Sequence, residues 1–447
     1  MSEVRKYDVI VIGSGSAGQT VVGDLVAAGK KVAVVEKRET GGTCALRGCE
    51  PKKILYSAVE VVERAQAQSG RGIQGSPTIN WQDLMKFKRS FIQPFSTGVE
   101  NWLRSSGVDL LRGSAVFVDE QRLSVDDQIY RAENYVIASG AKPMPLNIPG
   151  EDLVMSSEAF LEADSLAQRI IFIGGGYISF EFAHIAAVAG AQVTILQRGE
   201  RALAGFDPQL VDLVVAHYRQ QGITIQLNAE VKAVNRQADG LQVFLEDGSS
   251  LTGDWVVHAA GRIPDIDTLQ LEKAGIRFER RGVSVNPYLQ SISNQHVWAI
   301  GDASNVGLPL TPVGVLQGHI VADNILKGNR RIFQPKASPS VVFSSPPLTK
   351  VGLTEHEARQ QERDFRVKFV DMKNWASSRR VALPIAAAKV IIENGSNRIL
   401  GAHLLGHHAE EVINVFTAAI AGGLTAEEIT AIPWAYPTSS SDVVYMV

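Results

Sequence analysis

Residues 7–36 read YDVIVIGSGSAGQTVVGDLVAAGKKVAVVE, and this stretch decides the fold. A β-branched run is followed by a glycine turn, a run with helical spacing and a second β-branched run. Gly13, Gly15 and Gly18 form G-x-G-x-x-G. The first glycine allows a tight turn, the second lets the backbone approach a pyrophosphate, and the third lets helix and strand pack. Glu36 ends the second run, where a carboxylate accepts from ribose hydroxyls. The stretch predicts a dinucleotide-binding βαβ unit.

The same pattern returns in residues 169–198, RIIFIGGGYISFEFAHIAAVAGAQVTILQR. Gly174 and Gly176 hold the first two glycine positions, and Ser179, which is also small, stands in the third. The chain therefore uses the βαβ unit twice.

The end of the second copy favours one coenzyme. Where the first copy has Glu36, the second has Gln197, followed by Arg198 and Arg201. A carboxylate at this place suits a free 2′-hydroxyl, whereas a neutral residue followed by arginines suits a 2′-phosphate. We expect NADPH rather than NADH. The alternative, that the arginines form a solvated strand end, stays open.

The composition restricts the class of protein. The chain has 447 residues, of which 45% are hydrophobic and 20% charged, so two or three globular domains are expected. Lys plus Arg total 44 against 47 Asp plus Glu, which gives no basic surplus for nucleic acid. No run is long and apolar enough for a membrane span, and the N-terminus has no signal-type block. We expect a cytoplasmic protein without a nucleic acid or membrane partner.

The two cysteines stand close together in GGTCALRGCEPKK, as Cys44 and Cys49. A predicted helix start and the cations of Arg47, Lys52 and Lys53 favour thiolates here. Two inert buried thiols or half of a metal site would give the same spacing. Because the chain has no further cysteine and no histidine lies near the pair in sequence, a closed zinc site is not expected, and we predict no metal site.

Motifs that span essentially the whole chain occur in a fixed order: VIVIGSGSAG, GGTCALRGCEPKK, IASGAKP, GGGYISFE, AAGRIPD, AIGDAS, LTPV, VVFSSPPLTKVGLTEHEA and ILGAHLLG. With them the chain resembles the class I FAD-dependent pyridine nucleotide-disulfide oxidoreductases, the class of glutathione reductase, dihydrolipoamide dehydrogenase and mercuric reductase.

The resemblance implies an α/β protein with two Rossmann-like nucleotide-binding domains, for FAD and NAD(P), and a C-terminal α+β dimerisation domain. The expected boundaries are 1–150 for the first part of the FAD domain, 151–265 for the NAD(P) domain, 266–335 for the second part of the FAD domain and 336–447 for the dimerisation domain. The active unit would be a homodimer, with the C-terminal tail contributing across the interface.

The resemblance also assigns cofactor-binding residues. For FAD these are Gly13, Gly15, Gly18, Glu36, Gly42, Thr43, Lys53, Ser139, Gly140, Asp302 and Thr311. For the nicotinamide dinucleotide they are Gly174, Gly176, Tyr177, Ile178, Glu181, Arg198 and Gly261.

The catalytic roles follow from the same resemblance. Electrons would pass from NADPH through flavin to a Cys44–Cys49 disulfide, with Cys49 next to the flavin and Cys44 attacking the substrate. Tyr177 would gate the nicotinamide site. Glu181 would pair with a lysine beside the flavin, Lys53 or Lys52, because a buried carboxylate needs a cation.

The C-terminus departs from the family pattern. Most disulfide-reducing relatives carry a histidine and a glutamate there, which reach in from the other subunit and shuttle the thiol proton. Here the chain reads AYPTSSSDVVYMV, with Tyr436 in the histidine position, Ser441 in the glutamate position and Asp442 one place later. A phenol with a pKa near ~10 cannot replace an imidazole poised near ~6.5. The departure weakens the expectation of glutathione or lipoamide disulfide as substrate.

Three functions stay open. In the first, the enzyme still reduces a disulfide, either more slowly or with a substrate whose leaving thiol is acidic. In the second, it reduces a soft metal ion, an electrophile or a quinone that needs no general acid. In the third, it is a redox-sensing flavoprotein without turnover. Tyr436 itself is either catalytic or a packing aromatic. His407 and His408 could replace the missing base or bind metal, although a solvated helix start is the simpler interpretation.

Overall fold

The computed structural model describes residues 4–447 and divides them into two compact units. The first unit joins the chain up to residue 52 with residues 86–144 and 262–334. The second joins residues 53–85, 145–261 and 335–447. The four-segment division expected from the sequence stays a prediction.

The first unit is built on the predicted βαβ stretch: β1 (Arg5–Ile12), α1 (Ser16–Ala27) and β2 (Val32–Glu36). Its sheet has a parallel part and an antiparallel extension. The parallel strands are β3 (Asp109–Arg112), β2, β1, β6 (Gln128–Ile137) and β19 (Val297–Ala299); β5 (Arg122–Val125) and β4 (Ala115–Asp119) continue from β6 in antiparallel order.

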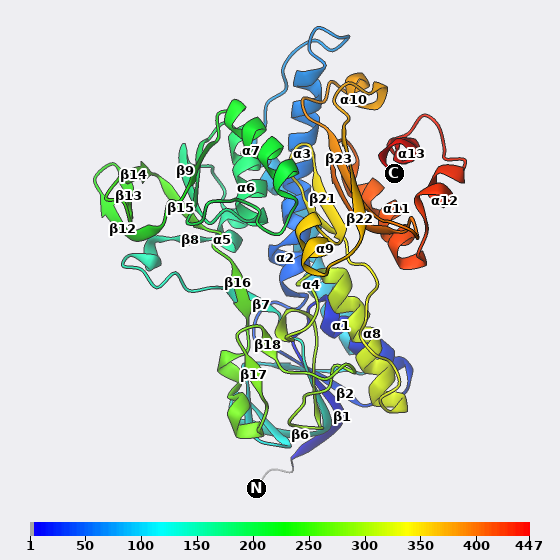
Figure 1. Cartoon of the computed structure of the whole chain (residues 1–447). Helices are drawn as coiled ribbons and strands as arrows, with labels where there is room; N and C mark the ends of the chain where they lie inside the picture. Colours follow the sequence, from blue (N-terminus) through cyan, green and yellow to red (C-terminus); the bar gives the residue numbers. More distant parts are fainter. Residues whose placement is uncertain (1–3) are drawn as a thin grey trace. The chain divides into compact units, whose positions relative to one another are not determined.

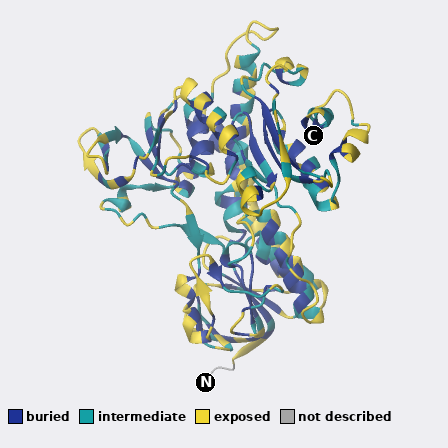
Figure 2. Cartoon of the chain, viewed as in Figure 1, coloured by how far each residue is buried: buried dark blue, intermediate teal, exposed yellow. Residues whose placement is uncertain are grey.

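Both faces of this sheet are covered, because successive side chains of a strand point to opposite faces. Val9 and Val11 of β1 pack with α1 and with α8 (Thr311–Lys327), whereas Ile10 and Ile12 belong to the apolar cluster of the other face. Helices α1 and α8 lie side by side in Figure 1, and the strands are buried in Figure 2.

Three helices frame the cysteine motif. They are α2 (Gly42–Arg47), α3 (Cys49–Ala67) and α4 (Trp81–Ser105). Gly48 separates α2 from α3, so Cys44 lies inside the first helix and Cys49 is the first residue of the second. The start of α3 belongs to the first unit and its remainder to the second.

The second unit contains the repeated βαβ stretch: β9 (Arg169–Ile173), α6 (Tyr177–Val188) and β10 (Gln192–Gln197). The parallel sheet has the order β11 (Thr224–Leu227), β10, β9, β15 (Trp255–His258) and β8 (Met155–Ser156). Helix α6 is buried over most of its length, and α7 (Pro208–Gln220) packs in the same core. An antiparallel sheet follows, of β12 (Val231–Gln237), β13 (Gly240–Leu245) and β14 (Ser250–Gly253).

The C-terminal part of the second unit is an antiparallel sheet with helices. Its strand order is β20 (Ser340–Val342), β21 (Leu348–Gly352), β24 (Ile399–Leu405), β23 (Ala387–Glu393) and β22 (Phe365–Asp371). The helices are α9 (Glu355–Gln360), α10 (Ala376–Arg380), α11 (Ala409–Gly422), α12 (Ala426–Ala431) and α13 (Val443–Met446). This mixture is the α+β module that the sequence predicts, so the predicted fold class is confirmed.

One buried ion cluster joins α7 to the C-terminal sheet. The Lys389 ammonium lies 2.9 Å from Asp207, the N-cap of α7, and 2.7 Å from Glu355. Burial opposes the charge on Lys389, but its bonds to the two carboxylates raise its pKa. Among residues 4–447, no helix combines the length and apolar character that crossing a bilayer requires.

Candidate active site

The first glycine turn leaves no room for side chains. Gly13 has a φ of +108°, and a Cβ there would lie 2.4 Å from the carbonyl oxygen of Ala138. Gly42, with a φ of +79°, lies against the same turn, because a Cβ there would lie 2.4 Å from the Cα of Gly15. Two backbone segments therefore approach each other so closely that glycine is required on both.

The carboxylate of Glu36 is held beside this turn. It accepts hydrogen bonds from the Ser14 nitrogen at 3.0 Å and the Ser14 hydroxyl at 2.6 Å, and its other oxygen accepts from Arg38 N at 2.9 Å. The Ser14 hydroxyl in turn accepts from Gly41 N at 3.0 Å. Ser14 thereby ties the nucleotide turn to the cysteine segment, a role that the sequence interpretation missed.

Further polar groups gather where FAD is expected. The hydroxyl oxygen of Ser139 is buried without a hydrogen-bond partner within residues 4–447, and Gly140 has a positive φ. Burial raises the pKa of Asp302, and Arg262 only partly opposes the shift. Thr43 is half-buried at the start of α2. A buried polar atom without a partner needs one, and a turn of glycines lets a pyrophosphate approach the backbone, so these residues fit the dinucleotide.

The cysteine pair is present as two free thiols, with Cys44 half-buried and Cys49 exposed. The Thr311 hydroxyl donates to the Cys44 sulfur at 2.9 Å. The bond from Cys49 and then that from Thr311 lower the pKa of Cys44 to about 7, against burial and the charge of Glu50. The bond to Cys44 and burial raise the pKa of Cys49, although Lys52 favours its thiolate.

The expected pairing of Glu181 with Lys53 or Lys52 stays a prediction, and the structure shows what surrounds Lys53. The Lys53 ammonium lies 3.5 Å from Glu60 and over the rings of Tyr56 and Phe343, at 4.4 Å and 4.3 Å from their centroids. Lys53, Tyr56 and Glu60 share one face of α3, because residues three, four and seven apart do so on a helix. By the same rule Lys52 shares a face with Cys49, and Lys52 is buried.

The second glycine turn repeats the geometry of the first. Gly174 has a φ of +110°, and a Cβ there would lie 2.4 Å from the Ala259 oxygen. The Ser179 hydroxyl donates to the Gly174 oxygen, which explains why serine is tolerated in the third position. Gln197 accepts from Gly175 N at 2.9 Å and donates to the Arg201 oxygen at 3.1 Å.

The remaining residues predicted to bind the nicotinamide dinucleotide lie around this turn. Tyr177 begins α6 and is half-exposed, whereas Glu181, one turn further, is buried and accepts from Phe343 N at 2.9 Å. Arg198 is exposed at the end of β10. Open space surrounds Gly176 and Gly261, and Ile178 packs partly buried against the core.

The C-terminal tail presents Tyr436 to solvent, with 87% of its surface exposed. Ser441 is bonded to Thr438 of the same turn. Its hydroxyl accepts from Thr438 N at 3.2 Å, and the Thr438 hydroxyl accepts from Ser441 N at 3.2 Å, which makes a capping box. The two residues in the family's histidine and glutamate positions thus supply no imidazole and no carboxylate.

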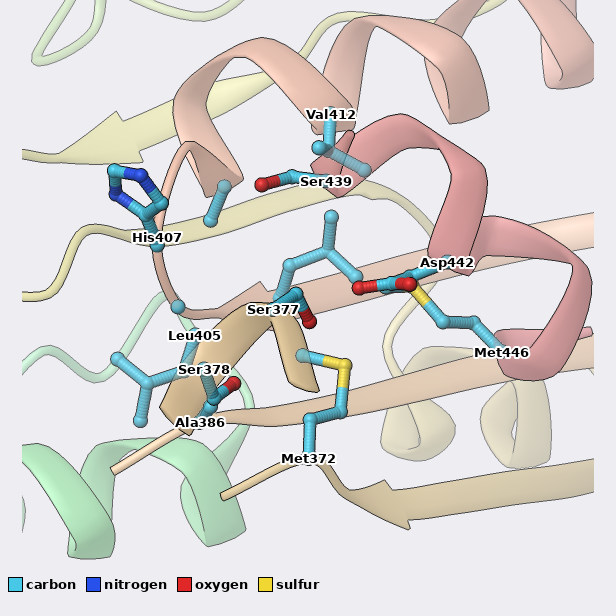
Figure 3. Close-up of a pocket in the computed structure, with 13 residues that line it drawn as sticks. Met372, Ser377, Ser378, Ala386, Leu405, His407, Val412, Ser439, Asp442 and Met446 are labelled. Atoms are coloured by element: carbon cyan, nitrogen blue, oxygen red, sulfur yellow. The ribbon is translucent and has the colours of Figure 1, made fainter. Parts of the chain in front are cut away.

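His407 differs from the solvated residue that the sequence suggests. It is half-buried, and it lines a small cavity with Met372, Asp442 and Met446 (Figure 3). Its Nδ1 lies 3.1 Å from the Arg64 guanidinium. Burial, His408 and two arginines lower the pKa of His407 to about 4, so it is a neutral acceptor at neutral pH.

Comparison with known proteins agrees with this site. The family model "Pyridine nucleotide-disulphide oxidoreductase" matches residues 7–318, and the model of that family's dimerisation domain matches residues 338–447. A glutathione reductase of Nostoc sp. is 31% identical over 459 residues, which cover 98% of this chain and 99% of that protein. A mercuric reductase of Staphylococcus aureus is 30% identical over 432 residues, which cover 95% of this chain and 79% of that protein.

Among solved structures, the HOCl-induced flavoprotein disulfide reductase RclA from Escherichia coli matches with a TM-score of 0.89 at 28% identity. The match covers 98% of this chain and 99% of that chain. A Cu(II) complex of RclA matches with the same TM-score.

Proposed function

The chain belongs to the pyridine nucleotide-disulphide oxidoreductase family, and on that premise we propose that it passes electrons from NADPH to a disulfide through the Cys44–Cys49 pair. It is a flavin-dependent oxidoreductase that uses FAD and a pyridine nucleotide, and its dimerisation domain makes it a homodimer. The single observation that carries the proposal is the Cys44 thiol, which accepts from Thr311 at 2.9 Å in a segment that Gly41 N ties to the first glycine turn through Ser14.

The residues of this chain have the following proposed roles. The two glycine turns bind the pyrophosphates of the two dinucleotides, and the Glu36 carboxylate accepts from a ribose of FAD. FAD, when bound, accepts the hydride and delivers the electron pair to the cysteines. Cys49 receives the pair, and Cys44 then attacks the acceptor.

Lys52, rather than Lys53, is the cation that we assign to the flavin side of Cys49. It is buried and follows Cys49 by one helical turn, and its charge favours the Cys49 thiolate. Lys53 is engaged with Glu60 and two aromatic rings.

A separate observation supports a second class of acceptor, one that needs no proton. Tyr436 and Ser441 supply no acid–base pair, so an acceptor that needs no proton, such as a soft metal ion, is compatible with the site. A mercuric reductase and a flavoprotein solved with Cu(II) are among the similar proteins. Thiolates bind soft ions well.

Anaerobic titration with NADPH tests the proposal. The holoenzyme should take up two electron pairs per subunit and develop a long-wavelength band between thiolate and flavin. Cys49→Ser should remove the band and the second electron pair, while Cys44→Ser should keep the band and lose turnover. If Cys49→Ser keeps both the long-wavelength band and the second electron pair, the assignment is contradicted.

Turnover with different acceptors then separates the two classes. Initial rates are measured with oxidised glutathione, a lipoamide-type disulfide, a thioredoxin-like protein, Cu(II) and Hg(II). The disulfide class predicts that at least one disulfide is reduced at a rate that depends on Cys44. Cys44-dependent reduction of metal ions alone would favour the second class.

A further inference from the structure

A buried histidine–carboxylate pair joins α3 to α6, and the proposed catalytic roles do not use it. His184 of α6 is buried, and its Nε2 lies 2.7 Å from Oε1 of Glu63 on α3. The side-chain amide of Gln221, which caps α7, donates to the same oxygen at 2.9 Å. Burial alone would raise the pKa of Glu63, but its interactions with His184 and Gln221 lower it, so the carboxylate is ionised at neutral pH. All three residues belong to the second unit.

His184 continues the face of α6 that carries the residues assigned to the nicotinamide. Tyr177, Glu181 and His184 are spaced by four and three residues, so they share one face of the helix. Most other buried side chains of α6 are apolar, and apolar contacts are not directional. The bond from Phe343 N to Glu181 and the contact of His184 with Glu63 are directional, so they define how α6 is rotated.

Glu63 continues the face of α3 that carries the cysteine. Cys49, Lys52, Tyr56 and Glu63 are spaced by three, four and seven residues and share one face of this helix. Glu63 lies about 21 Å along the helix axis from Cys49. A bond at Glu63 can therefore set the register between the two faces without touching a reacting atom.

We propose that the Glu63–His184 pair fixes the rotation and register of α6 along α3, and so positions Tyr177 and Glu181 for the reduction of FAD by NADPH. This inference rests on the proposed function, in which NADPH is the electron donor. Glu63 and His184 are positioning residues, because they act through α6. Loss of the pair should slow flavin reduction and leave the later exchange at Cys44 unchanged.

A second histidine makes the pair sensitive to pH. His217 of α7 is buried and close enough to interact with both Glu63 and His184. Within residues 4–447, no hydrogen-bond partner is present for Nδ1 of His217 or for Oε2 of Glu63. Burial lowers the pKa of His217, and the charge of Glu63 only partly opposes this, so the imidazole is neutral at neutral pH. Once acid protonates His217, its buried N–H needs an acceptor, and Glu63 is then shared between α6 and α7.

Two tyrosines complete the surroundings of the pair. Tyr56 of α3 and Tyr218 of α7 are fully buried, and burial raises the pKa of both phenols. The other carboxylates that act on these phenols are Glu60, Glu181 and Glu410. Both phenols stay protonated near neutral pH, so neither offers a charge that could replace the Glu63 carboxylate.

Anaerobic stopped-flow measurements on the holoenzyme separate the two halves of the reaction. Flavin reduction by NADPH is followed first, and reoxidation of the reduced enzyme by its best acceptor is followed second. Glu63→Gln and His184→Gln should each slow flavin reduction at least about tenfold at pH 7.5, because misplaced reacting groups lose rate steeply. Reoxidation should change less than about twofold. Asp24→Asn is the matched control, since Asp24 forms an exposed pair with His319 at 2.6 Å.

Two further measurements show that the pair acts as a unit and responds to acid. The double variant should be no slower than either single variant, because both substitutions remove the same contact. Flavin reduction in the wild type should slow as the pH falls from 8 to 5.5, and His217→Gln should remove most of this fall. A purely structural loss would not remove it. Flavin content is measured in every variant as the control for folding.

Three results would overturn the proposal: normal flavin reduction in both single variants, equal slowing of flavin reduction and reoxidation, or an unchanged pH profile in His217→Gln. Each of them leaves the proposed function standing, because the wild type would still pass electrons from NADPH to its acceptor. Conversely, a wild type that NADPH reduces with the expected pH profile, but that no acceptor reoxidises through Cys44, would refute the proposed function alone.

Discussion

Gln197 accepts a hydrogen bond from Gly175 N at 2.9 Å, as Glu36 accepts one from Ser14 N at 3.0 Å in the first turn. The two side chains hold corresponding places beside two glycine turns and differ in charge. The neutral amide leaves the second turn able to accept an additional phosphate, which a carboxylate would repel.

Arg198 should therefore discriminate between the coenzymes. Arg198→Ala removes a cation from the exposed end of β10 and should raise the KM for NADPH about 10- to 100-fold, the range for a charge-assisted hydrogen bond. The KM for NADH should change less than about twofold. Arg236→Ala, an exposed arginine on β12, is the matched control. An equal rise in the KM for NADPH and for NADH would contradict the assignment of Arg198 to the 2′-phosphate.

The close contact between Gly42 and Gly15 should control flavin retention. Gly42→Ala places a Cβ 2.4 Å from the Cα of Gly15 at a φ of +79°, so the backbone must shift. We expect a destabilisation of about 2 kcal/mol and loss of most bound FAD, measured as the flavin-to-protein absorbance ratio. Gly176→Ala, which adds a Cβ to open space in the other turn, should keep its flavin.

The buried ion cluster around Lys389 should contribute strongly to stability. Lys389→Ala leaves the Asp207 and Glu355 carboxylates without their shared cation, and breaking a buried pair in this way costs about 3 kcal/mol of unfolding free energy. Denaturant titration measures the change. Lys232→Ala, at an exposed pair with Glu230, should leave the midpoint unchanged. A similar midpoint in both variants would show that the cluster is not stabilising.

His407 should make stability fall as the solution is acidified. Its pKa is lowered to about 4 in the folded chain, below the ordinary value near ~6.5. The neutral form stabilises the fold fully above the unfolded value, and this contribution is lost as the pH falls toward 4. His407→Gln should reduce the fall in Tm between pH 7 and 4.5. His356→Gln, at an exposed histidine, should retain the wild-type slope.

Local spacing explains what the sequence could predict. The two βαβ units follow from glycines whose positive φ values and close backbone contacts only glycine satisfies, as at Gly13 and Gly174. The sequence interpretation already named Lys52 as the alternative to Lys53, and helical spacing favours it, since it follows Cys49 by three residues on α3. The pairing of Lys53 with Glu60 follows from the same rule.

Contacts between distant segments could not be predicted. Thr311 reaches Cys44 only because α8 begins beside the cysteine motif, and no local pattern encodes that approach. His407 likewise contacts Arg64 of α3, which is far from it in sequence. Such contacts arise from tertiary packing, which overrides the preference of a single segment.

The capping box of Thr438 and Ser441 makes the tail easy to redesign. A threonine cap followed three residues later by glutamate is the commoner form of this motif, so Ser441→Glu would keep the turn intact. Together with Tyr436→His it would return both family side chains without rebuilding the backbone between them. Two substitutions would thus place an imidazole and a carboxylate on a turn whose backbone already suits them.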